Sequence, residues 1–252
     1  MFTGEDIIYN KIENTKKDFD SKNKELLMKV ESEIITAHAS KLIGFLKGAN
    51  FITENKIYFL SLLLKAEDMV INSFHLARQR AFIETFSILR IAIEAIATAI
   101  HISKDEKALN NYLNSNYKST SSISYSKRYI PIIGEMWGAF SKAVVHINSK
   151  IYGPDIKIDK NKLYESITIN YEAHLSNDNR LDNLVLIAIQ LIAVMVQRAF
   201  EIIFFKEVIF KGIPCLKIPD TDLIMFGRKY SDKINDLYNK FLDVDSLIKK
   251  ED

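Results

Sequence analysis

Hydrophobic residues recur at helical spacing along most of this chain. From Glu5 to Lys47 they follow mostly helical intervals, which predicts one long or two consecutive amphipathic helices ending at Gly48. Thr53 is suited to cap a further helix that begins near Glu54. A single helix from there to residue 103 would be about 75 Å long, too long for a compact domain of this size. We therefore predict a turn in the polar segment 75–81, HLARQRA, between two antiparallel helices.

The second half of the chain is less uniform. Residues 110–128 are rich in Ser, Asn and Tyr, which predicts a long loop or a loosely packed insertion. A helix is predicted from about Met136 to Ile147. Alternation of apolar and polar residues near 155–172 predicts a small β-hairpin, and residues 229–249 predict a final amphipathic helix.

The most hydrophobic stretch is Leu184–Phe210. Its longest uncharged run, Asn183–Gln197, is shorter than the roughly 20 residues that cross a bilayer. We therefore predict a buried core helix and no membrane span. Arg198 and Glu201 are spaced to pair across one turn of that helix.

These elements predict a mainly α, multi-helix bundle that forms a single domain over residues 1–252. Its predicted parts are the N-terminal amphipathic helices at 1–48, a helical core at 54–149, a hairpin insertion at 150–175, and a C-terminal core helix, loop and final helix at 180–252.

Composition narrows the class of protein. The chain is 48% hydrophobic and 26% charged, which is typical of a globular domain, and its net charge of +2 predicts no global attraction to nucleic acid or membrane. One cysteine cannot form an internal disulfide, and the N-terminal residues lack the order of a signal peptide, so we expect a cytoplasmic protein. Abundant Lys, Ile and Asn suggest an AT-rich bacterial genome.

The helix predicted over residues 82–102 is apolar on every face except for one line of polar side chains. At about 100° per residue, Glu94 and His101 lie about 40° and 20° from Arg90 around the helix axis, so all three face one way. Arg90 precedes Glu94 in the chain, and an ion pair within a helix is weaker when the basic residue comes first. We therefore expect these groups to meet partners on other helices. They form either an active or ligand site or a buried polar network that fixes helix register.

Basic residues suggest two weaker nucleic-acid contacts. Arg78 and Arg80 lie at the predicted turn. Lys118, Lys127 and Arg128 are interleaved with tyrosines in the predicted loop, a pattern that suits base stacking and phosphate contacts, although a solvated loop would show the same composition.

Several chemistries find no support in the sequence. It contains no Gly-rich phosphate loop and no GxSxG elbow, and its five histidines never occur as HxH or HxxxH. We therefore predict no metal site and no cofactor.

The segment SILRIAIEAIATAIHI, followed after a loop by WGAFSKAVVHINS, resembles bacterial all-helical families grouped distantly with HEPN domains. The resemblance covers residues 54–149. It implies that Arg90, Glu94, Ser141 and His146 converge at one surface or cavity. The chain departs from the family pattern in one respect, because Ser141 and His146 are five residues apart where four are expected.

The resemblance also implies a function. HEPN domains are associated with metal-independent RNA cleavage in defence or stress systems, usually by a homodimer with its site at the subunit interface. The nuclease members carry arginine followed by four to six residues and then histidine, and no such pair occurs in this chain. RNA cleavage would then require that Arg90 and His146 meet in space, with His146 as general base and Arg90 stabilising the phosphate charge.

Three functions therefore compete. The first is an RNA- or nucleotide-interacting component of a defence or stress system, with RNase activity open. The second is a noncatalytic module for homodimerisation or partner binding, in which the polar line only gives specificity. The third is a small-ligand sensor with a pocket between the bundle helices.

Overall fold

The computed structural model describes residues 4–48, 54–145, 155–157, 168–170, 179–212 and 232–246. This part of the chain is mainly α, as predicted. The helices are α1 (Gly4–Lys22), α2 (Lys24–Gly48), α3 (Glu54–Arg78), α4 (Phe82–Lys104), α5 (Glu106–Leu113), α6 (Ser119–Ser126), α7 (Ile133–Val145), α9 (Asn179–Gly212) and a C-terminal helix at 232–246.

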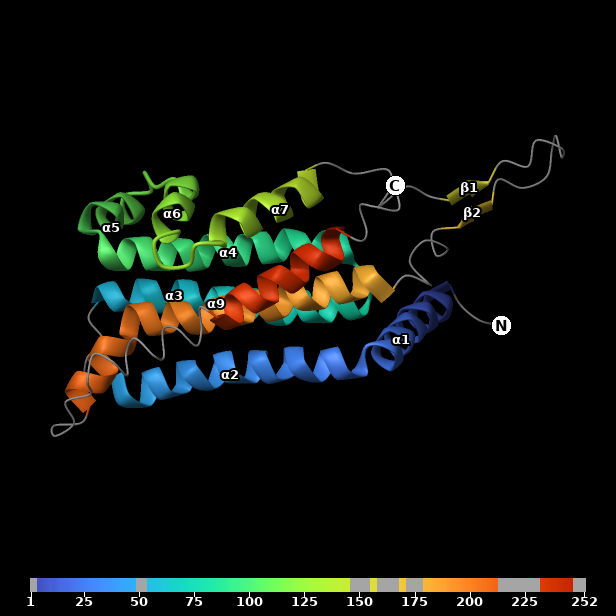
Figure 1. The fold of residues 1–252 in the computed structure, drawn as a ribbon, viewed down its shortest axis with the longest axis horizontal. Helices are drawn as coiled ribbons and strands as arrows, with labels where there is room; N and C mark the ends of the chain where they lie inside the picture. The colour runs from blue at the N-terminus through green and yellow to red at the C-terminus, as the bar shows by residue number, and fades with distance from the viewer. Residues whose placement is uncertain are drawn as a thin grey trace.

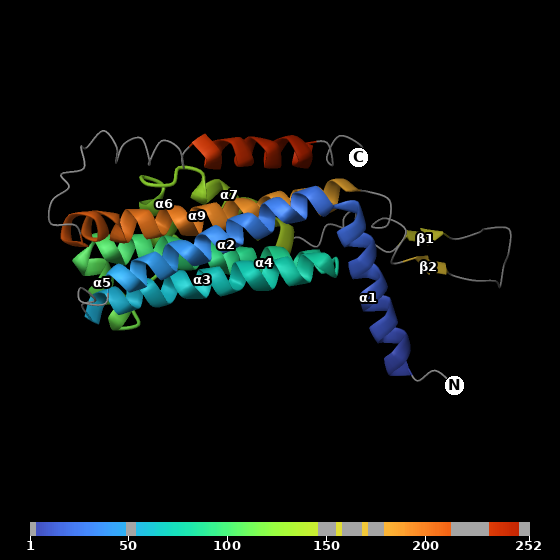
Figure 2. The ribbon, with the colours of Figure 1, turned by 90° about the horizontal axis from the view of Figure 1, so that it is seen from below.

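The long helices α2, α3, α4 and α9 run side by side and form the body of the bundle (Figure 1). Helix α4 lies between two groups of neighbours: it packs on α3 and α9 on one side and on α6 and α7 on the other. Helix α1 is angled away from the bundle, as Figure 2 shows. The α3–α4 pair and the α5–α7 layer therefore meet along α4.

Helix α4 is central because it is apolar nearly all round. Leu89, Ile93, Ile96 and Ile100 are fully buried in one continuous core that includes residues of α2, α3, α7 and α9. A helix that buries most of its faces must be covered by neighbours on several sides. The polar side chains of Thr98 and His101 on α4 are consequently buried against other helices.

The predicted turn between α3 and α4 is confirmed. Helix α3 ends at Arg78 and α4 begins at Phe82. Arg80 adopts the left-handed region with φ of 56°, which is uncommon outside glycine and is sustained here by the contacts of its side chain. Of the two arrangements predicted for the N-terminal segment, one long helix or two consecutive helices, the structure has the second. The segment divides into α1 and α2 at Asn23.

The prediction of a loop over residues 110–128 is wrong. These residues contain the end of α5 and the whole of α6. The Asp105 carboxylate caps α5 by accepting the backbone N–H groups of Lys107 and Ala108. Ser122 and Ser126 of α6 are buried, and Ser126 Oγ donates to the carbonyl oxygen of Ala97 at 2.9 Å. Buried hydroxyls that satisfy their hydrogen bonds explain how so polar a segment packs as helix.

Two short strands, β1 (Asp155–Lys157) and β2 (Thr168–Asn170), pair antiparallel with Ile156 opposite Ile169. The rest of the predicted insertion at 150–175 lies outside the described residues. The hairpin insertion therefore stays a prediction.

Two helices are long and apolar enough to cross a bilayer, over Phe82–Lys104 and Arg180–Ile203. In the bundle, 72% and 78% of the residues in their most apolar windows are buried against other parts of the protein. Core helices of soluble proteins share these properties, so cytoplasmic location and the absence of a membrane span stay predictions.

Candidate ligand-binding site

Arg90 and Glu94 are held between α4 and α7. Arg90 Nη2 lies 3.4 Å from Glu94 Oε1, and the Arg90 guanidinium carbon lies 5.3 Å from the centre of the Trp137 ring. Trp137 Nε1 donates a hydrogen bond of 2.8 Å to the same Glu94 oxygen. The pair therefore does meet a partner on another helix, and a cation–π contact holds the guanidinium in place.

The Glu94 carboxylate is only partly used by these contacts. Both of these contacts are made with Oε1, and Oε2 takes no part in them. The side chain is 24% exposed and lines a hollow on the surface of the bundle. Glu94 thus has one oxygen committed to the fold and one available to a ligand.

His101 belongs to a separate cluster. It lies eleven residues beyond Arg90, roughly 16 Å along the helix axis. His101 Nδ1 is 2.8 Å from the Tyr117 hydroxyl oxygen, Nε2 is 3.7 Å from Asp105 Oδ2, and the ring stacks on Tyr125 with centroids 4.2 Å apart. Arg90, Glu94 and His101 all face the α5–α7 layer, but they form two groups of contacts rather than one.

Burial governs the protonation of the His101 cluster. Burial lowers the pKa of His101, against the opposing effect of the Asp105 carboxylate, and so favours the neutral ring. Burial likewise raises the pKa of Tyr117, which favours the phenol. The backbone N–H of Ala108 lowers the pKa of Asp105, which therefore stays ionised.

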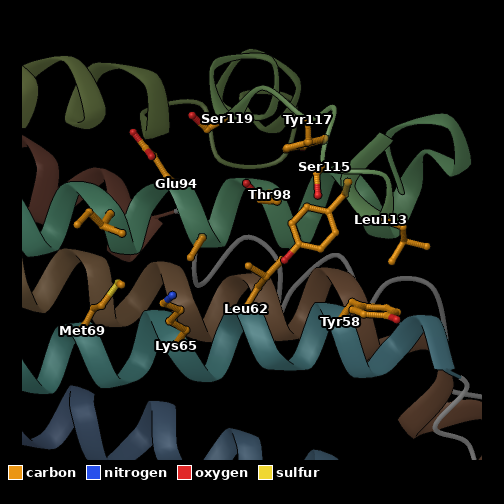
Figure 3. Close-up of a pocket in the computed structure, with 13 residues that line it drawn as sticks. Tyr58, Leu62, Lys65, Met69, Glu94, Thr98, Leu113, Ser115, Tyr117 and Ser119 are labelled. Atoms are coloured by element: carbon orange, nitrogen blue, oxygen red, sulfur yellow. The ribbon is translucent and has the colours of Figure 1, made fainter. Parts of the chain in front are cut away.

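An open cleft of about 720 Å³ lies beside α4 (Figure 3). Glu94, Thr98 and Tyr117, which we call the polar edge, lie on its α5–α7 side, whereas Lys65 lies on its α3 side. Leu62, Met69, Ile91 and Ala95 supply apolar lining, and the aromatic lining consists of Tyr58, Tyr112 and Tyr117. This volume falls in the range of about 300–1,000 Å³ that is typical of ligand pockets.

A smaller hollow of about 280 Å³ lies behind Tyr117. Tyr117 lines both hollows, while His101, Asp105, Lys107 and Lys118 line only the smaller one. Ser115 and Ser119 line the cleft, whereas Asn116 and Lys118 line the smaller hollow. The α5–α6 connector is therefore the wall between the two hollows.

Arg78 and Arg80 lie at the other end of α4, and both are paired with carboxylates. Arg80 Nη1 and Nη2 each lie 3.0 Å from a carboxylate, of Asp18 and Asp182 respectively, and Asn23 Nδ2 also donates to Asp182 at 3.0 Å. Arg78 Nε donates to Asp20 at 2.7 Å. We call Asp18, Asn23, Arg80 and Asp182 the junction cluster. Both arginines therefore join helices, and their guanidinium groups are bonded to carboxylates of the protein itself.

Lys118, Lys127 and Arg128 are exposed around α6. Lys118 lines the smaller hollow, the Lys127 side chain lies over Gly134, and the Arg128 guanidinium carbon lies 4.8 Å from the centre of the Tyr125 ring. They flank the His101 cluster but do not line the cleft. Their contact with nucleic acid stays a prediction.

The predicted Ser141 and His146 do not add to the site as described. Ser141 Oγ donates to the carbonyl oxygen of Trp137 at 2.7 Å, a bond within α7. His146 lies outside the described residues. No group of three or more His, Cys, Asp or Glu side chains that could hold a metal occurs in the described ranges.

Sequence reasoning missed most of the cleft. Tyr58, Leu62, Lys65 and Met69 lie at helical spacing on one face of α3, a signal present in the sequence but also typical of an ordinary packed face. The part played by Trp137 was hidden because its partner, Glu94, is 43 residues away.

Comparison of the chain with family models, with curated proteins and with solved structures finds no match. The resemblance to HEPN domains therefore stays a prediction.

Proposed function

We propose that this protein binds a nucleobase-bearing ligand, a nucleotide or the end of an RNA strand, in the cleft between α3, α4 and the α5–α6 connector. The observation that carries the proposal is the lining of the cleft, which combines three tyrosine rings with apolar side chains and two opposite charges. Aromatic rings stack on bases at about 1–3 kcal/mol per base, and a few polar groups then fix orientation.

The charges have separate parts in this proposal. Lys65 is exposed and is the one cation that lines the cleft among the described residues, so it is the candidate contact for a phosphate. Glu94 Oε2 is the candidate acceptor for a base N–H. The setting that goes with such a ligand is the defence or stress role implied by the HEPN resemblance.

Strand cleavage is not part of the proposal. The Arg90 guanidinium is held by Glu94 and Trp137, and no described histidine lies near it. His101, the described histidine on α4, is in contact with Tyr117 and Asp105. The described residues thus bring no histidine to Arg90 as a general base.

Calorimetric titration tests the proposal with the four ribonucleoside 5′-monophosphates and a short single-stranded RNA. We expect saturable binding of at least one of them, weakened about tenfold or more by Tyr58→Ala. Tyr9→Ala is the matched control, because Tyr9 is 67% exposed on α1, away from the cleft. Absence of binding by the folded wild type would overturn the proposal, as would equal effects of the two substitutions.

A second candidate function is homodimerisation or partner binding. Met28 and Ile35 are 62% and 66% exposed, and their spacing of seven residues places them on one face of α2. Exposed apolar side chains that share a face suit a protein interface. Sedimentation of wild type and Met28→Lys tests it: a dimer that the substitution converts to monomer supports the interface, and a wild-type monomer removes it.

A further inference from the structure

A chain of hydrogen bonds runs behind the polar edge of the cleft. Thr98 Oγ1 donates to Ser122 Oγ over 3.5 Å, and Ser122 Oγ is hydrogen-bonded to the Tyr117 hydroxyl. Tyr117 is in turn bonded to His101 Nδ1 at 2.8 Å, and His101 Nε2 faces Asp105 at 3.7 Å. Five polar residues from α4, the α4–α5 link, the α5–α6 connector and α6 are thereby linked through the wall of the cleft.

The Asp105 carboxylate orients this chain electrostatically. At 3.7 Å from Nε2, an ionised carboxylate attracts a ring N–H and repels a ring lone pair, so the proton of the neutral His101 ring is favoured on Nε2, and Nδ1 is left as an acceptor. Tyr117 must then donate its hydroxyl proton to Nδ1. Ser122 donates to Tyr117 because the Tyr117 proton is committed, and Thr98 donates to Ser122.

The consequence appears on the cleft side. The hydroxyl protons of Thr98 and Tyr117 point into the wall, so these side chains offer the cleft oxygen lone pairs only. The third member of the polar edge, Glu94, offers Oε2, which is also an acceptor. Ser115 and Ser119 hydroxyls at the rim can rotate to suit either kind of partner. The polar edge therefore presents three acceptors and no donor.

We propose that the polar edge selects guanine among the bases, because guanine alone carries two adjacent N–H donor groups, N1–H and the 2-amino group. This inference rests on the proposed function. Adenine, cytosine and uracil place an acceptor beside their amino or N–H group and so oppose lone pairs to lone pairs at the polar edge. Hypoxanthine has C2–H where guanine has the 2-amino group, which leaves one acceptor of the edge without a donor. Unpaired polar groups of this kind discriminate strongly between ligands.

Guanosine and inosine 5′-monophosphates form the sharpest test, because they differ only by the 2-amino group. By calorimetric titration of the full chain, we expect the guanosine nucleotide to bind about tenfold or more tightly than the inosine nucleotide, since a hydrogen bond to a charged acceptor is lost. Glu94→Gln, which can turn a donor toward the ligand, should reduce that ratio to about twofold or less. Glu84→Gln, the same change at an exposed site on α4, should preserve it.

Thr98→Val provides a second variant of similar shape that removes one acceptor without touching Trp137, and it should also lower the ratio. Equal binding of the two nucleotides by the wild type would overturn the guanine inference while leaving the proposed function standing. A ratio unchanged in both Glu94→Gln and Thr98→Val would overturn it as well. Absence of binding by every nucleotide would instead overturn the proposed function itself.

Discussion

The two ends of α4 use polar side chains in opposite ways. In the junction cluster, Arg80 is paired with both Asp18 and Asp182, and Asn23 supplies a further donor to Asp182. At the cleft, the partners of Glu94 share one of its two oxygens. Side-chain exposure follows the same division, since Asp182 is 1% exposed and Glu94 is 24% exposed.

This difference separates a structural network from a candidate site. Buried charges must be matched, because an unmatched one costs several kcal/mol, and the junction cluster meets that requirement while joining α1, the α3–α4 turn and α9. A ligand site needs polar groups that the fold positions but does not saturate. The cleft fits the second description.

The largest effect is expected from Asp182→Ala. The substitution leaves the Arg80 guanidinium buried with half of its carboxylate partners and removes the acceptor of Asn23, so the free energy of unfolding should fall by about 3–5 kcal/mol. Denaturant titration followed by circular dichroism measures the loss.

Asp236→Ala is the matched control for this experiment. It breaks an ion pair with Lys240 in the C-terminal helix, where both side chains are more than half exposed, and should change stability by about 0.5 kcal/mol or less. Similar losses in the two variants would show that the junction cluster does not hold the helices together.

An intermediate effect is expected from Trp137→Phe. The substitution removes the hydrogen bond to Glu94 Oε1 and weakens the ring face that holds Arg90, while an aromatic ring stays between α4 and α7. We expect a loss of about 1 kcal/mol in the free energy of unfolding, less than for Asp182→Ala. Denaturant titration of Trp137→Phe, Glu94→Gln and the double variant measures the coupling, and strictly additive losses would contradict this contact.

The sequence predicted the features that depend on neighbours along the helix. The turn at 75–81 and the pair of Arg198 with Glu201 are both confirmed, because polar clustering and one-turn spacing are local properties. The mainly α fold is confirmed for the same reason: apolar residues at helical spacing run through most of the chain.

Features that depend on distant segments were not predictable in this way. Arg80 finds Asp182 across 102 positions, so a pattern that suggested a basic surface became a buried ion pair. Helix α6 is stabilised by a bond from Ser126 to α4, 29 positions away, which no local reading of a Ser- and Tyr-rich segment reveals. The cleft likewise arises from three segments that meet only in the fold.

The smallest effect is a pH dependence of stability that originates at His101. Burial lowers its pKa below the ordinary value of 6.5, and the charged groups that face it are Asp105 and the more distant Arg128. A histidine with a lowered pKa in the folded state binds fewer protons than in the unfolded state, so it destabilises the fold as the pH falls below 6.5 toward the lowered pKa and has no effect at higher pH. The free energy of unfolding of the wild type should therefore decline between about pH 7 and pH 5 more steeply than that of His101→Gln.

His75→Gln, which changes an exposed histidine of α3, should keep the wild-type slope. Equal slopes for wild type and His101→Gln would mean that the ring accepts a proton as readily in the fold as in water, and the fixed direction of the hydrogen bonds behind the polar edge would then lose its basis.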